Sequence, residues 1–410
     1  MGCTLALGTG VGYVSGAPNR PGVCTETAAV CAEFDNFWEV WNLVEARFVD
    51  QEAVESDEMI AGAINGMLDS LGDQGHTRYL TAEQSQRFRE GLTGEYEGIG
   101  AYLDEEGGVP IIVAPIEGSP AEAAGILPGD MILRVNGKST EGMTVDELVS
   151  VVKGPQGTKV KLQVVHAGEE APIEITITRG AITVPAVTWR MLPGKIAHVR
   201  LSQFAEGADK QLRTTLQDVR AQGARGLIMD VRDNPGGLVE QAVNITGMFV
   251  RKGDAVLIQD SRNGSKKTYR SAESKPLLDL PTVVLINGGS ASSAEIFAGA
   301  LQDYDRATLV GVPTAGTGTV LTTIGLDDGS ELLLGIAQWQ TPKGRYLRRE
   351  GVSPDETLGL PAGVRPLTPT TAKNLSDAEI LRTEDVQVLR ALEILRKGPS
   401  ATATPVTPAR

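Results

Sequence analysis

The segment Val283–Ala307, VVLINGGSASSAEIFAGALQDYDRA, constrains the fold more than any other part of this 410-residue chain. Its apolar run Val283–Ile286 predicts a buried strand, and the small residues of Gly288–Ser292 predict a tight turn. A helix is expected next, because apolar residues then recur at helical spacing. These are Ile296, Phe297, Ala300 and Leu301. A strand that feeds directly into a helix is the building unit of α/β layers.

A serine at such a junction lies where the first N–H groups of a helix are unpaired and the helix dipole is positive. That environment stabilises an alkoxide and a developing oxyanion, which favours a nucleophilic serine. The alternative is that Ser290, Ser292 and Ser293 only cap the helix.

Similar units precede this one. Strands are predicted at Ile196–Leu201 and Gly226–Val231, and helices at Ala208–Gln222 and Leu238–Val250. The turn Arg232–Gly237, RDNPGG, ends in two glycines, which let a backbone N–H approach a carbonyl oxygen closely. A plain strand-to-helix turn is the alternative for either glycine. Together the units predict an α/β core.

The chain before this core divides into two patterns. Apolar residues at helical spacing predict helices over Phe34–Phe48 and Asp57–Leu71, with these residues in a core, and a third helix over Thr81–Gly91. A turn is expected between the second and third helices, at Gly72–Leu80. From Thr93 to Arg179 short strands alternate with glycine turns. The markers are Gly98-Ile99-Gly100-Ala101, SPAEAAGI, PGD and VNG.

Those four markers, in this order, resemble a PDZ domain. The resemblance implies that the N–H groups of Gly98, Ile99, Gly100 and Ala101 hold a peptide's terminal carboxylate while the peptide adds as a strand. After the core, strands are predicted at Leu332–Ala337 and Tyr346–Val352, and one helix at Asp377–Lys397. The tail from 398 to 410 lacks large apolar residues and is expected to be disordered.

Composition argues against several classes of function. The net charge of −14 and the lack of a dense basic stretch argue against nucleic-acid binding. The cysteines, Cys3, Cys24 and Cys31, all precede the core and lie in no ligand cluster, so neither a metal site nor a cofactor is expected.

The leader MGCTLALGTGVGYVSGAP is weakly apolar and has no charge before Arg20. It reads either as the remnant of a signal-anchor that attaches the chain to a membrane or as a Gly-rich leader.

SASSAEIFAGALQDYDRA, followed by VGVPTAGTGTV and GVSPD, resembles the C-terminal processing (tail-specific) serine proteases, from about Phe34 to Asp355. The resemblance implies a crotonase/ClpP-like core, the nucleophile Ser292, and a supporting aspartate, Asp303. It also implies an oxyanion hole made by the N–H group of Ser293 with that of Gly236 or Gly237. Extracytoplasmic localisation (periplasm or cell envelope) follows from the same resemblance.

One departure concerns the base. The family's lysine lies between two glycines and is followed by a glutamine, but here Thr317 and Leu321 occupy those places. Threonine cannot accept the proton, because its hydroxyl is no more basic than that of serine. His76, in GDQGHTRYL, resembles the histidine of tricorn-type relatives and has a suitable pKa. A structural role in the turn is the alternative for His76, and Lys343 is expected to be an exposed turn residue.

The sequence therefore predicts an α/β multidomain serine endopeptidase that selects proteins by apolar C-terminal tails. The alternative is an inactive pseudoprotease that binds tails as an adaptor. A homo-oligomer is left open. The predicted parts are a leader (1–32), a helical domain (33–91), a PDZ domain (92–180), a protease core (181–360), a C-terminal helical segment (361–397) and the tail (398–410).

Overall fold

The structure is a computed structural model that describes residues 28–73, 76–106, 109–116, 118–166, 168–169, 171–273 and 279–397. The predictions for the leader and for the tail fall outside these residues. The chain forms two compact units. The first comprises Met1–Arg87, Asp260–Ser265 and Thr319–Gln338, and the second comprises Phe88–Gln259, Lys266–Gly318 and Trp339–Arg410.

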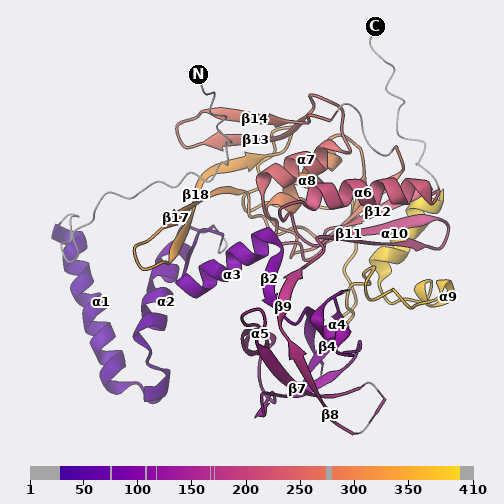
Figure 1. The fold of residues 1–410 in the computed structure, drawn as a ribbon. Helices are drawn as coiled ribbons and strands as arrows, with labels where there is room; N and C mark the ends of the chain where they lie inside the picture. The colour runs from indigo at the N-terminus through magenta and orange to yellow at the C-terminus, as the bar shows by residue number, and fades with distance from the viewer. Residues whose placement is uncertain are drawn as a thin grey trace, which may run out of the picture. The chain divides into compact units, whose positions relative to one another are not determined.

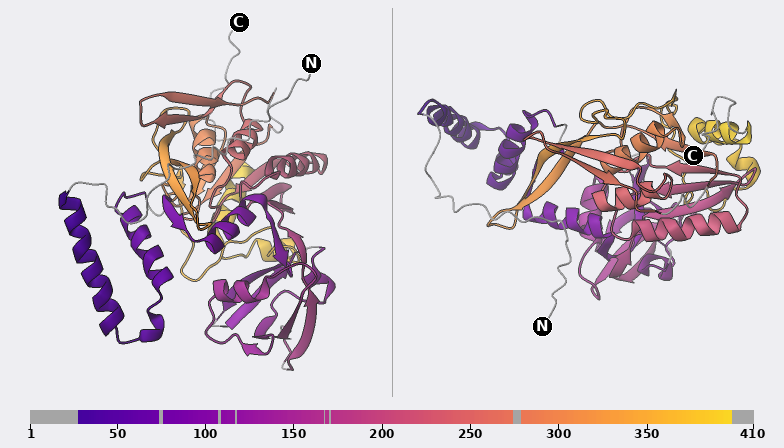
Figure 2. Two further views of the ribbon diagram at one scale, coloured as in Figure 1. Left: turned by 60° about the vertical axis from the view of Figure 1, so that its left-hand side comes forward. Right: turned by 90° about the horizontal axis from the view of Figure 1, so that it is seen from above.

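The first unit begins with two helices, α1 (Ala28–Arg47) and α2 (Ser56–Asp69), joined through the 3-10 turn η1 (Gln51–Ala53) (Figures 1 and 2). Strand β1 (Arg78–Leu80) pairs antiparallel with β18 (Glu331–Gln340), and Thr319 of β17 (Thr319–Gly325) lies opposite Gln338 of β18. The prediction of a turn over 72–80 is therefore partly wrong. Its last three residues form a strand that pairs with β18, about 250 residues further along the chain.

Helix α1 does not bury its aromatic face, and the prediction of a core there is wrong. The side chains of Phe34 and Trp38 are 53% and 54% exposed. Instead, the rings contact one another along the helix: Phe37 and Trp38 lie 5.2 Å apart, centroid to centroid. In α2 only Leu68 is buried. Helical spacing predicts which residues share a face, but it does not predict whether another element covers that face.

The second unit starts in α3 (Ala82–Thr93) and continues into the segment predicted as a PDZ domain. Five strands form a sheet in the order β3-β4-β5-β7-β8, with β6 beside β5, around the apolar core of Ile112, Ile132, Leu148 and Leu162. Its two ends are joined by the pair β2–β9, in which Gly98 lies opposite Gly180. The elements are β2 (Glu95–Gly98), β3 (Ala101–Glu106), β4 (Val109–Pro115), α4 (Pro120–Ala123), β5 (Met131–Val135), β6 (Lys138–Ser139), α5 (Val145–Val152), β7 (Lys159–Val165), β8 (Ile173–Thr178) and β9 (Gly180–Thr183).

A six-stranded sheet, β10-β11-β12-β15-β16-β19, organises the remainder (Figure 1). It is parallel from β11 to β19, so its central strands are apolar on both faces. Helices α6, α7 and α8 follow strands of this sheet, and α10 packs on the face that carries Ile228 and Val283. The bounds are β10 (Val187–Leu192), β11 (Ile196–Leu201), α6 (Ala208–Ala221), β12 (Gly226–Asp230), α7 (Val239–Gly247), β13 (Ala255–Ser261), β14 (Lys266–Arg270), β15 (Thr282–Ile286), α8 (Ser293–Asp303), β16 (Thr308–Gly311), β19 (Glu356–Thr357), α9 (Asp377–Ile380) and α10 (Val386–Lys397).

The α/β prediction for the core is confirmed, with two local errors. Residues 346–352 form turns rather than a strand, apart from the single bridge between Tyr346 and Gln340. The helix predicted over 377–397 is broken into α9 and α10, because the Asp385 carboxylate accepts the N–H groups of Gln387 and Val388 and starts a new helix.

Candidate active site

Ser292 lies at the N-terminus of α8, after β15 and the turn Asn287–Ala291. Its backbone has φ 51° and ψ −112°, a conformation that L-residues rarely adopt. Strained backbone of this kind persists only where the surroundings hold it, and it concentrates at functional sites. The Ser292 side chain is half-buried, whereas Ser293 and the rest of the first turn of α8 are buried.

The Ser292 backbone is held by Glu295 and Thr317. Its N–H group donates to Glu295 Oε2 at 2.9 Å and to Thr317 Oγ1 at 2.8 Å. Thr317 in turn donates from its hydroxyl (2.9 Å) and its N–H (3.0 Å) to the same carboxylate oxygen. The second oxygen, Glu295 Oε1, accepts from the hydroxyl of Thr314 at 2.6 Å and from Gly316 N–H at 2.7 Å. Five donors therefore satisfy this fully buried carboxylate.

The hydroxyls of Ser290 and Ser293 serve the structure. Ser290 Oγ donates to Val231 O at 2.7 Å, and Ser293 Oγ donates to Gly237 O at 2.9 Å. Ser290 thus joins the turn before Ser292 to Val231, which precedes the Arg232–Gly237 turn, and Ser293 joins the start of α8 to Gly237. These bonds brace the neighbouring segments, and the N-cap residue of α8 is Ser292.

Further bonds tie the same two turns together. Asp233 and Asn287 exchange two hydrogen bonds, from Asp233 N–H to Asn287 Oδ1 at 2.8 Å and from Asn287 Nδ2 to Asp233 Oδ1 at 2.7 Å. Ala291 N–H donates to Asn234 O at 2.9 Å, and the buried Asn234 side chain donates to Leu201 O at 2.7 Å. The glycine turn is thus fixed against the nucleophile turn.

Gly236 and Gly237 differ in the use of their N–H groups. Gly236 N–H donates to Asn234 Oδ1 at 2.9 Å, whereas Gly237 N–H has no acceptor within the part of the chain that the structure describes. Both glycines have positive φ, 98° and 135°. A Cβ on Gly236 would lie 2.8 Å from Ser292 Cβ, and one on Gly237 would lie 2.5 Å from Phe204 O. Only glycine fits either place.

Asp303 lies at the other end of α8, eleven residues or about 16 Å along the helix axis from Ser292. Its buried carboxylate accepts the Arg345 guanidinium through Oδ1, with Nη2 at 2.5 Å, and Lys343 N–H through Oδ2 at 2.7 Å. Asp303 is therefore neither an exposed helix carboxylate nor a neighbour of Ser292. It holds the turn at Thr341–Arg345.

His76 belongs to the first unit, in a cluster with Asp73 and Thr319. Thr319 Oγ1 lies 2.6 Å from His76 Nδ1 and donates its hydrogen to Asp73 Oδ2 at 3.1 Å. If the one hydrogen of that hydroxyl goes to Asp73, Nδ1 is the donor to Thr319 and Nε2 is the basic nitrogen. Burial lowers the pKa of His76 to about 4; Asp73 opposes this shift and Arg78 adds to it. The imidazole is thus neutral at pH 7, but its pKa lies well below the value near neutrality that suits a general base, so the prediction of a suitable pKa is wrong.

The remaining candidate bases occupy ordinary positions. Lys343 is exposed, as predicted, and so are Lys266 and Lys267. His166 pairs with Asp130 at 2.7 Å, and the fully buried His198 contacts Asp230 at 3.1 Å. No group of three His, Cys, Asp or Glu side chains suited to a metal ion occurs among the described residues.

The predicted carboxylate loop connects β2 to β3. Gly100 has φ 80°, and a Cβ there would lie 2.5 Å from Ser119 Cβ. Burial, with a contribution from Tyr102, raises the pKa of Tyr96 to about 12, while the backbone groups of Ala101 and Gly100 act in the opposite direction. The loop carbonyls are used, since Ala121 N–H and Ile116 N–H donate to Ile99 O and Gly100 O.

Sequence reasoning did not foresee the roles of Glu295, Asp73 and Thr319. Glu295 three residues after Ser292 matches a capping box, a signal that was available. The contacts of Asp73 and Thr319 join residues 246 positions apart, and no local pattern reports such a pair.

Two parts of this chain match known protein families, and most of the chain resembles known proteases in sequence. Residues 195–358 match peptidase family S41, and residues 111–165 match the PDZ domain. The carboxy-terminal processing protease CtpA of Bacillus subtilis is 39% identical over 330 residues, which cover 80% of this chain and 70% of that protein. The chain belongs to peptidase family S41.

One further relative and one solved structure also match this chain. The carboxyl-terminal-processing protease of Synechocystis is 35% identical over 364 residues, 87% of this chain and 82% of that protein. A crystal structure from Bacteroides fragilis, assigned to the S41 proteases, matches this chain with a TM-score of 0.56 at 16% identity. The match covers 93% of this chain and 100% of the Bacteroides chain, and it shows a shared fold. The predicted fold of helical N-terminal part, PDZ domain and protease core is confirmed.

Proposed function

We propose that this S41 peptidase is a serine endopeptidase that cleaves proteins selected by their C-terminal tails, with Ser292 as the nucleophile. The observation that carries the proposal is the placement of Ser292. It has strained backbone at a helix N-terminus and is held by Glu295 and Thr317 beside the glycine turn. The relatives that this chain matches are named as processing proteases, which gives no support to a binding-only adaptor.

In the proposed reaction Ser292 Oγ attacks the carbonyl carbon of the scissile peptide bond. The carbonyl oxygen becomes an oxyanion that accepts the N–H groups of Gly237 and Ser293. Gly237 is preferred to Gly236, because the Gly236 N–H already donates to Asn234. The tetrahedral intermediate then expels the amine, and water hydrolyses the acyl-enzyme.

His76 is the base that we propose for the serine proton. Its Nε2 carries the free lone pair, and Thr319 and Asp73 fix the tautomer as a third group does in other serine hydrolases. His76 then returns the proton to the leaving amine. Asp303 acts at a distance, by holding the Thr341–Arg345 turn.

The PDZ domain supplies substrate selection in this proposal. The loop Gly98-Ile99-Gly100-Ala101 would hold the terminal carboxylate of an apolar tail, and the tail would add as a strand.

The substrates are expected outside the cytoplasm, in the periplasm or cell envelope, with the N-terminal leader as the membrane attachment. No helix in the described ranges is both long and apolar enough to span a membrane. Cell fractionation would test the location.

The experiment is turnover of an unfolded protein with an apolar tail by the parent chain, Ser292→Ala, His76→Ala and the control His166→Ala. Loss in the first two variants, with His166→Ala active, is the expected result. Loss in Ser292→Ala alone would remove His76 from the mechanism. No turnover by the parent, with tail binding intact, would establish an adaptor instead.

A further inference from the structure

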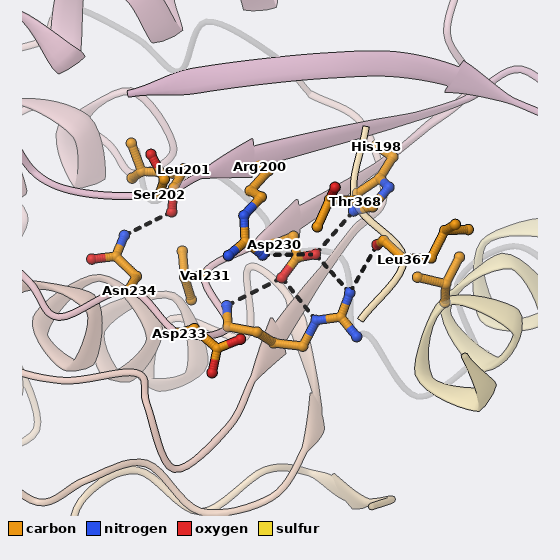
Figure 3. Close-up of polar contacts among 12 residues, drawn as sticks. His198, Arg200, Leu201, Ser202, Asp230, Val231, Asp233, Asn234, Leu367 and Thr368 are labelled. Carbon is orange, nitrogen blue, oxygen red and sulfur yellow. Dashed lines mark hydrogen bonds and ion pairs between the residues drawn. The ribbon is translucent and has the colours of Figure 1, made fainter. Parts of the chain in front are cut away.

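A buried ion cluster joins the C-terminal segment to the glycine turn, and none of the catalytic steps proposed above uses it. Asp230 ends β12, and Arg232 follows two residues later; both side chains are fully buried. Arg232 Nε donates to Asp230 Oδ1 at 2.9 Å and Nη2 donates to Oδ2 at 2.7 Å. Figure 3 shows Asp230 beside the side chains of His198 and Arg200, whose nitrogens lie 3.1 and 3.7 Å from Asp230 Oδ2.

The other side of the Arg232 guanidinium contacts the C-terminal segment. Nη1 donates to Asp385 Oδ2 at 2.8 Å and to Gln387 Oε1 at 2.9 Å, and Nη2 donates to Leu367 O at 3.2 Å. Asp385 also accepts Leu367 N–H at 2.7 Å. The Arg232 side chain thus joins Asp230 at the end of β12, the backbone of Leu367, and Asp385 and Gln387 at the start of α10.

Both carboxylates of this cluster face a permanent cation. Burial alone would raise the pKa of Asp230, but the Arg232 guanidinium, with His198, holds that pKa well below its usual range. Burial would lower the pKa of Arg232, but Asp230 and Asp385 keep it above its usual range. The pair of Asp230 and Arg232 is therefore ionic although both side chains are fully buried.

A buried ion pair is a poor source of stability, because desolvation offsets most of the Coulomb attraction and apolar replacements are often as stable. Its geometry, however, is specific. Arg232 is the residue at which the chain enters a turn with positive φ at Asp233 (55°), Gly236 (98°) and Gly237 (135°). A strained turn keeps its shape only if its ends are fixed.

We infer that Arg232 and Asp385 are positioning residues, through which the C-terminal segment 367–397 holds the Asp233–Gly237 turn in the geometry that binds the oxyanion. This inference rests on the proposed function of Ser292. The segment 367–397 lies outside the matched S41 region, and the inference makes it a part of the catalytic apparatus. A misplacement of the turn would slow attack on the carbonyl without changing tail binding.

The full chain carrying Asp385→Asn tests this, with Gln387→Met as a milder second variant that removes one acceptor of Arg232. The matched control is Glu356→Gln, which breaks the ion pair between β19 and Arg390 of α10 (2.6 Å) and leaves Arg232 untouched. Two quantities are measured on each: the rate at which a fluorophosphonate labels Ser292, and amide hydrogen exchange across 233–238.

The expected result is labelling slowed by about 10- to 100-fold in Asp385→Asn, less in Gln387→Met, with faster exchange across 233–238 in both. Tail-peptide affinity should not change, and the control should match the parent in both measurements. Parental labelling and exchange in Asp385→Asn and Gln387→Met, or an equal effect of Glu356→Gln, would overturn the inference. A parent that is never labelled refutes the role of Ser292, and the exchange data alone then decide the positioning role.

Discussion

The hydroxyl of Thr317 lies 2.8 Å from the backbone nitrogen of Ser292 and accepts its N–H. The residue that replaces the lysine expected from the family resemblance therefore binds the backbone of the nucleophile. It also donates to Glu295, so it bridges the serine and the buried carboxylate. A threonine that makes both bonds is a part of the site, although it cannot accept the serine proton.

Thr317→Val removes the hydroxyl while keeping the side-chain shape. Because Glu295 then loses a donor inside the core, we expect a loss of about 1–3 kcal/mol in unfolding free energy and slower turnover. Thr317→Ser, which retains the hydroxyl, is the matched control and should stay close to the parent. Chemical denaturation and initial rates measure both effects. Equal stability and turnover in Thr317→Val and Thr317→Ser would show that the hydroxyl has no role.

The pH dependence follows from His76. Its pKa of about 4 in the folded chain lies below the ordinary 6.5, so the unfolded chain takes up this proton first as the pH falls. The stability that His76 contributes is complete above pH 6.5 and decreases as the pH falls from 6.5 towards 4. Activity that depends on neutral His76 should accordingly persist below pH 6.5.

A profile of kcat/KM against pH checks this, with denaturation curves at each pH. We expect the acidic limb below pH 6.5, and a shallower loss of stability with acid in His76→Gln than in the parent. An acidic limb centred at or above neutral pH would exclude His76 as the base.

Gly237→Ala tests the oxyanion turn. The new Cβ would lie 2.5 Å from Phe204 O in a backbone with φ 135°, so the turn must shift. Loss of one oxyanion donor lowers kcat by about 100- to 1,000-fold in other hydrolases, and a similar loss is expected here. Gly253→Ala is the control, because Gly253 also has positive φ (83°) but open space around its Cβ. Comparable losses of kcat in the two variants would assign the effect to backbone strain alone.

Gly100→Val tests the PDZ loop. A Cβ at Gly100 would lie 2.5 Å from Ser119 Cβ, so the loop must open and the affinity for a tail peptide should fall. Labelling of Ser292 by a fluorophosphonate should not change. Gly118→Val, with φ 75° and no atom near its Cβ, is the control. Unchanged tail affinity in Gly100→Val would place the peptide elsewhere. Fluorescence anisotropy of a labelled tail peptide gives the affinities.

The sequence predicted those elements whose pattern is local. The strand Ile196–Leu201 was predicted with the bounds that β11 has, and Ser292 was predicted at a strand-to-helix junction, where β15 and α8 place it. Long-range contacts were not predictable. Helical spacing in α1 gave a shared face for Phe34 and Trp38 but no element that covers it.

Side-chain partners were predicted least. The bond from Ser292 to Thr317 and the ion pair from Arg232 to Asp385 join residues 25 and 153 positions apart. Such pairs depend on the tertiary fold. The break between α9 and α10 has the same origin, because Asp385 is committed both to Arg232 and to the start of α10.

The antiparallel pair β2–β9 has a consequence for modularity. Gly98 lies opposite Gly180, so the two ends of the PDZ domain leave side by side, roughly 5 Å apart. An insertion with adjacent ends can be replaced by a different module, or by a short hairpin, without altering the spacing of the flanking chain. Under the proposed function, the set of C-terminal tails that the PDZ domain selects can therefore change in evolution, or by grafting, while the protease core stays the same.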